Sequence, residues 1–200
     1  MDPLYDTARR RVMAALAGLP LTGMALASDA NTGGRQQPPR ILVTYFSRSG
    51  NTRVIAGLIH RQLGTDLFEI RPAAPYPDDY LETVAQAEKE RTGGVEPALA
   101  STVPDMANYD TVFLGFPIWG QTAPAVIRSF LSQHDLSGKT LIPFITHGGY
   151  GLGSSRAVLT RHAPKATLLD GFVLEADQER RTMETVTAWL KGVPVRGQGK

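Results

Sequence analysis

The 200-residue sequence contains no cysteine. This absence excludes disulfide bonds, thiolate zinc sites, cysteine-ligated iron–sulfur clusters and cysteine nucleophiles. The sequence also has no strong excess of positive or negative charge. It contains 21 Lys and Arg residues and 19 Asp and Glu residues, which give a formal net charge of +2. A nearly balanced charge, without a basic patch interleaved with aromatic side chains, gives no support for a nucleic-acid-binding protein. No two histidines have metal-ligand spacing, so we expect no metal site.

The first 27 residues are typical of a secretory signal peptide. Three arginines at residues 9–11 precede a mild, Ala-rich apolar stretch, which ends in the small-x-small sequence A-L-A at residues 25–27. The adjacent arginines resemble a twin-arginine signal. The apolar stretch is too short and too broken to span a bilayer permanently, so we expect no membrane span after processing. We expect export to the periplasm, with residues 28–39 as a flexible tether. If the segment is instead an amphipathic helix, or if the start codon is wrongly assigned, we expect the protein to be cytoplasmic.

Residues 40–193 alternate between short apolar runs and amphipathic segments, and we expect residues 194–200 to be a tail. The expected strands are 41–46, 66–70, 111–116, 140–146 and 168–174. The expected helices are 51–63, 79–91, a helix that Thr122 caps and that runs to about residue 133 with Pro124 in its first turn, 154–162 and 179–191. This alternation predicts one α/β domain with a parallel sheet covered on both faces. Such sheets bind ligands outside the carboxyl ends of their strands, so the loops after the first, third and fourth strands form the candidate site.

The loop after the first strand combines hydroxyl side chains with the start of a helix. Its sequence is Ser47-Arg48-Ser49-Gly50-Asn51-Thr52. Three hydroxyls, a glycine that permits close backbone approach and unpaired helix amides favour an anion, and a terminal phosphate monoester fits best. The loop lacks the Walker lysine and the G-x-G-x-x-G spacing, which disfavours a nucleoside triphosphate or a dinucleotide. A polar helix-capping turn is the alternative interpretation.

The other two loops contribute aromatic rings and glycines. They contain Pro117, Ile118, Trp119 and Gly120 after the third strand, and Thr146, His147, Gly148, Gly149, Tyr150 and Gly151 after the fourth. Aromatic rings beside glycine-lined backbone suit a planar heteroaromatic ligand. Trp119 is alternatively a lid over the core. We expect His147 to position backbone rather than to react.

In their order and spacing, these three loops resemble the flavin-binding loops of flavodoxin-like proteins, over about residues 40–191. The resemblance implies a three-layer sandwich with a five-stranded parallel sheet of order 2-1-3-4-5, and FMN as the cofactor. It implies that the first loop holds the phosphate and that Trp119 stacks on the isoalloxazine, with Tyr150 as the second ring. It also implies that Gly120 lies near the ring's N5 and that Gly148 and Gly149 face its pyrimidine edge.

The expected function is electron transfer through non-covalently bound FMN, with a redox partner protein or NAD(P)H as the electron donor. An NAD(P)H-dependent flavin or quinone reductase of the same fold and a non-redox binding module are the alternatives. The near-neutral charge differs from the strongly acidic simple carriers of the family, which leaves the partner open. The oligomeric state is not indicated. The charged helix at residues 79–91, which includes Glu88 and Arg91, is expected to present a solvated face.

Overall fold

The computed structural model describes residues 40–175 and 179–194 of the chain. The expected signal peptide and tether, and all of the expected tail except its first residue, lie outside these residues. The strands are β1 Ile41–Tyr45, β2 Asp66–Glu69, β3 Thr111–Pro117, β4 Thr140–His147, β5 Thr167–Leu168 and β6 Phe172–Glu175. The helices are α1 Asn51–Leu63, α2 Tyr80–Thr92, α3 Ala125–Gln133, α4 Ser155–His162 and α5 Glu179–Gly192, with a short 3-10 helix at Met106–Asn108.

The strands form one sheet in the order β2-β1-β3-β4-β5, and β6 also pairs with β4. All of these pairs are parallel, so the predicted order 2-1-3-4-5 is confirmed. The central strand β3 is buried along Thr111–Phe116, as expected of a parallel strand covered on both faces. Within the described residues, no helix is both long enough and apolar enough to cross a membrane.

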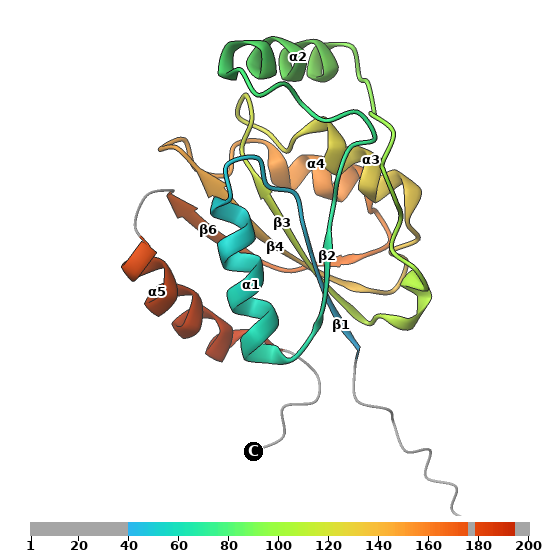
Figure 1. Ribbon diagram of the computed structural model, residues 1–200. Coiled ribbons are helices and arrows are strands. Elements are labelled where there is room, and N and C mark those ends of the chain that lie inside the picture. Colours follow the sequence, from blue (N-terminus) through green and yellow to red (C-terminus); the bar gives the residue numbers. More distant parts are fainter. Residues whose placement is uncertain (1–39, 176–178, 195–200) are drawn as a thin grey trace, which may run out of the picture. The chain divides into compact units, whose positions relative to one another are not determined.

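Helices cover both faces of the sheet (Figure 1). On one face α1 and α5 pack on a cluster that includes Ile55, Phe113 and Phe144. On the other face α3 and α4 pack on a cluster that includes Phe116 and Phe130. Helix α2 differs from these four helices, because it lies beyond the carboxyl ends of the strands, next to α3. The loops of the candidate site emerge at this same edge of the sheet.

The fifth strand is interrupted, contrary to the expected continuous strand over residues 168–174. β5 pairs with the start of β4 and β6 with its end, which leaves Leu169–Gly171 between them. The interruption lies beside Pro143, a residue of β4 that has no N–H to donate to a neighbouring strand. Gly171 lies against this proline so closely that a Cβ atom on Gly171 would be 2.0 Å from the Pro143 carbonyl oxygen. The proline in β4 therefore explains the break in the strand beside it.

Helix α3 has Pro124 as its N-cap, two residues after Thr122, the expected cap. The Thr122 N–H donates to the Trp119 carbonyl at 3.2 Å, and the Trp119 N–H donates to the Thr122 carbonyl at 3.0 Å. The two residues thus close a tight turn whose central residues, Gly120 and Gln121, have φ of 55° and 64°. Pro124, with its fixed φ, stands immediately before the first helical residue. Thr122 therefore shapes the loop after β3 rather than the helix.

Candidate functional site

A cavity of about 740 Å³ opens at the carboxyl edge of the sheet, where the loops after β1, β3 and β4 meet. Such a volume is typical of small-molecule sites. The predicted site residues in its lining are Arg48, Ser49, Pro117, Ile118, Trp119, Gly120, Gly148 and Tyr150. Loops that are up to about a hundred residues apart in the sequence thus share one cavity, because parallel strands end at the same edge of the sheet.

The other predicted site residues shape the loops without forming part of this lining; they are Ser47, Gly50, Asn51, Thr52, Thr146, His147, Gly149 and Gly151. The Thr52 and Thr146 hydroxyls lie 2.9 Å apart and are buried, which joins the start of α1 to the end of β4. The Gly149 N–H donates to His147 Nδ1 at 3.0 Å. His147 thus contacts the backbone of its own loop.

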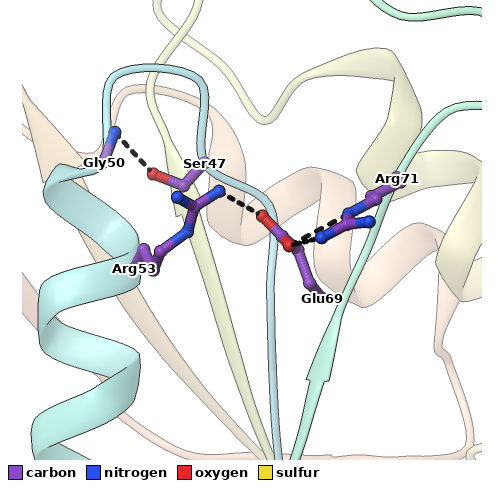
Figure 2. Close-up of polar contacts among 5 residues, drawn as sticks. All are labelled: Ser47, Gly50, Arg53, Glu69 and Arg71. Atoms are coloured by element: carbon purple, nitrogen blue, oxygen red, sulfur yellow. Dashed lines mark hydrogen bonds and ion pairs between the residues drawn. The ribbon is translucent and has the colours of Figure 1, made fainter.

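The loop after β1 presents the amino end of α1 to the site. Gly50 adopts a φ of 96°, and its N–H donates to the Ser47 hydroxyl oxygen at 3.1 Å (Figure 2). Helix α1 then begins at Asn51, with no acidic side chain in its first turn. Because the first amides of a helix have no partner within the helix and carry its positive dipole end, this loop is suited to an anion.

Glu69, at the end of β2, lies between two arginines beside this loop (Figure 2). Arg53 of α1 donates to one carboxylate oxygen at 2.6 Å, and Arg71 donates to the other through Nε at 3.0 Å and also through Nη2. Burial raises the pKa of the Glu69 carboxyl, but the hydrogen bonds and charges of Arg53 and Arg71 outweigh it and lower the pKa. The negative charge of Glu69 is therefore balanced by its two arginine partners. Together the three side chains carry a net charge of +1 beside the loop.

Trp119 belongs to an aromatic cluster at the cavity. Its ring lies 5.2 Å from Phe46 and 4.8 Å from Tyr76 between centroids, and both pairs are nearly perpendicular. Tyr76 donates its hydroxyl to Glu90 of α2 at 2.8 Å. Burial and the hydrogen bond to Glu90 raise the pKa of Tyr76, so this hydroxyl remains protonated and a donor. The Glu90 side chain, itself buried, thereby fixes Tyr76 and through it the surroundings of Trp119.

Helix α2 forms one side of the cavity, a role that its sequence pattern did not predict. Its lining residues are Tyr80, Thr83, Val84, Ala87, Glu88 and Arg91, which recur at helical spacing along one face. Glu88 and Arg91 are exposed, as expected of a solvated charged face, but they also line the cavity. Tyr80 and Val84 keep 68% and 44% of their surface exposed. The apolar residues Tyr80, Val84 and Ala87, at three- and four-residue intervals, could have indicated that this face of α2 lines a site. They are few, however, among the many charged residues of the helix.

Both ends of α2 are tied to the loops of the site. Arg48 donates to the carbonyl oxygen of Asp78 at 2.6 Å and to that of Pro77 at 3.4 Å, just before the helix begins. Near the other end, Arg91 donates through Nη1 to the carbonyl oxygen of Gly120 at 3.2 Å. The guanidinium groups of two site residues therefore hold α2 over the cavity.

Among the residues that the structure describes, no cluster of three or more His, Asp or Glu side chains could hold a metal ion. The arrangement instead combines a loop suited to an anion, a tryptophan, an exposed tyrosine and glycine-rich backbone around one cavity. These features suit a flat, largely apolar ring joined to an anionic group.

Comparisons with known proteins identify the family and the fold of the chain. The flavodoxin family matches residues 40–193. A candidate flavoprotein of Bacteroides eggerthii is 34% identical, with a TM-score of 0.68, over 78% of this chain and 99% of that chain. One from Bacteroides uniformis is 32% identical, with a TM-score of 0.69 and the same coverage of both chains.

A Lactobacillus acidophilus flavoprotein, solved in complex with FMN, is 22% identical, with a TM-score of 0.61, over 73% of this chain and 99% of that chain. This likeness shows the fold alone. A search of curated proteins finds no match. The match over residues 40–193 and the Bacteroides eggerthii relative carry the assignment: the chain belongs to the flavodoxin family.

Proposed function

We propose that this protein binds FMN non-covalently and transfers electrons through it. The observation that carries the proposal is the single cavity in which the loops after β1, β3 and β4 meet. Family membership supports FMN as the cofactor, and the Lactobacillus acidophilus protein of the same fold was solved with FMN bound. FMN supplies the electron-accepting and electron-donating chemistry when it is bound, and the protein supplies position and electrostatics.

The described residues fit the two chemically different ends of FMN. The loop at Ser47–Thr52 would hold the phosphate with hydroxyls and helix amides, without an opposing carboxylate in the first turn of α1. Trp119 and Tyr150 line the cavity where the ring would lie, and α2 adds the apolar surfaces of Tyr80 and Val84. Burial of a flat ring against these side chains excludes water from it and stabilises binding.

The proposal is tested by titrating flavin-free protein with FMN and following the quenching of flavin fluorescence and the visible spectrum. We expect one FMN per chain. Trp119→Ala should weaken binding by about tenfold, because an aromatic stacking contact contributes up to about 1.5 kcal/mol and a tenfold change in affinity is about 1.4 kcal/mol. Trp119→Phe, which keeps an aromatic ring, should retain most of the affinity. Absence of FMN binding by the folded wild-type protein would contradict the proposal and favour a non-redox binding module.

Anaerobic addition of NADPH or NADH to the FMN-loaded protein separates a carrier from a reductase. We propose a carrier, whose flavin is bleached by dithionite but not by nicotinamide cofactors. Rapid bleaching by either nicotinamide would instead assign the reductase activity.

We also propose that the N-terminal segment directs export through the twin-arginine route, on the strength of its sequence pattern alone. A receptor recognises the signal of this route. The route transports folded proteins, which suits a protein whose cofactor is inserted before transport. Arg9→Lys combined with Arg10→Lys should retain the protein in the cytoplasm, as measured by cell fractionation. Undiminished export of that double variant would contradict the proposal.

A further inference from the structure

Arg91 occupies a distinctive place, because it lies on the cavity face of α2 and contacts the loop after β3. Its Nη1 donates to the Gly120 carbonyl oxygen at 3.2 Å. The contact is close enough that a Cβ atom on Gly120 would lie 1.6 Å from that nitrogen. Gly120, whose φ is 55°, thus accommodates both a left-handed turn and a guanidinium group at the cavity.

Among the described residues, the charged side chains that line the cavity are Arg48, Arg91 and Glu88, which together carry a net charge of +1. Arg48 is committed to the carbonyl oxygens of Pro77 and Asp78. Glu88 Oε1 lies 3.9 Å from Arg91 Nη2, and the two side chains are 65% and 38% exposed. Such an exposed pair is weak. The Glu88 carboxylate therefore only partly offsets the positive field of Arg91.

We propose that Arg91 sets the redox balance of the site by favouring the reduced, anionic form of the bound flavin. Reduction adds two electrons and one proton to oxidised FMN, so the ring gains one negative charge. A fixed cation at the cavity stabilises that charge, and a fixed anion opposes it. The proposal rests on the proposed FMN binding, and it gives Arg91 and Glu88 opposite effects on the flavin.

The test measures the midpoint potential of FMN-loaded protein by dithionite titration against a reference dye, together with the affinity for oxidised FMN. Arg91→Gln should lower the ratio of the affinities for reduced and oxidised FMN by about tenfold, which is about 30 mV for a two-electron couple. Glu88→Gln should shift the potential in the opposite direction. Arg91→Lys, which keeps the charge with a different hydrogen-bonding geometry, should stay close to the wild type.

Lys89→Gln is the matched control, because it removes the same charge from the same helix at an exposed residue outside the cavity lining. We expect its potential to remain that of the wild type. If all variants bind FMN but Arg91→Gln leaves the potential unchanged, or Lys89→Gln shifts it as much, the role of Arg91 is refuted while FMN binding stands. If the wild-type protein binds no FMN, the proposed function itself fails.

Discussion

His134 is a buried polar residue of the core beside α3, and both of its ring nitrogens are in use. The Val103 N–H donates to Nε2 at 2.9 Å, and Nδ1 lies 2.7 Å from the Phe130 carbonyl oxygen. Nε2 must be unprotonated to accept, so the proton sits on Nδ1, which donates to Phe130. Protonation of Nε2 would turn the Val103 contact into a repulsive donor–donor pair. The ring is therefore held neutral, and burial lowers its pKa.

We predict that this protein loses stability as the pH falls below about 6.5, the ordinary pKa of histidine. Above that pH both the folded and the unfolded His134 are neutral, so the stabilisation is complete. Below it only the unfolded chain takes up the proton, so the free energy of unfolding falls by at most about 1.4 kcal/mol per pH unit from this group. Urea unfolding at pH 7.5 and 5.5 measures the loss.

His134→Asn serves as the control, because it removes the titrating ring. It should be less stable than the wild type at pH 7.5 but should show a smaller loss between pH 7.5 and 5.5. An NMR titration in which the folded His134 ring protonates at or above the ordinary histidine pKa would contradict the prediction.

The elements of the fold could largely be predicted where local sequence decides them. Helix α1 has the predicted bounds, since Gly50 and Gly64 adopt left-handed conformations at its two ends and its apolar residues follow one face. The interrupted fifth strand could not be predicted in this way. Its cause, Pro143, lies in a neighbouring strand, and only the register of the sheet brings it beside Gly171.

In the candidate site, too, the local sequence predicts some features, and residues distant in the sequence decide others. The three loops carry their own signals in glycine, hydroxyl and aromatic residues. The contribution of α2 depends on where a mostly polar helix docks, and that is decided by distant partners such as Arg48 and Gly120. A charged helix face has the same local pattern whether water or a cavity lies in front of it.

At the break between β5 and β6, we predict that Gly171→Ala lowers the free energy of unfolding by about 1–3 kcal/mol, as overpacking does. The added methyl group would overlap the Pro143 carbonyl oxygen, which belongs to the backbone of β4 and cannot rotate away. Thermal and urea unfolding measure the effect. Gly57→Ala in α1 is the matched control: the nearest atom to its new Cβ is an Arg61 side-chain nitrogen at 3.1 Å, which can move.

For Gly57→Ala we expect a gain of up to about 1 kcal/mol, because alanine is the better residue in a helix interior. Equal effects of the two substitutions would show that the close contact with Pro143 does not prevent residue 171 from carrying a side chain.

On the scale of the whole molecule, the site connects parts of the chain that the sheet alone does not. Arg48 links the loop after β1 to the start of α2, and Arg91 links the end of α2 to the loop after β3. The buried hydroxyl pair of Thr52 and Thr146 joins α1 to the end of β4. A ligand that contacts all three loops and α2 would therefore add contacts between elements that already meet through the sheet, the core clusters and these hydrogen bonds.

We therefore predict that FMN raises the stability of the entire domain, by about 2.7 kcal/mol at a free concentration one hundred times its dissociation constant. Riboflavin, which lacks the phosphate, should stabilise the protein far less at the same concentration, because the loop at Ser47–Thr52 would have no anion to bind. Thermal unfolding with each flavin measures the difference. Ser49→Ala removes a hydroxyl from the cavity lining and should reduce the FMN effect while leaving the riboflavin effect unchanged. Equal stabilisation by the two flavins would show that this loop does not recognise phosphate.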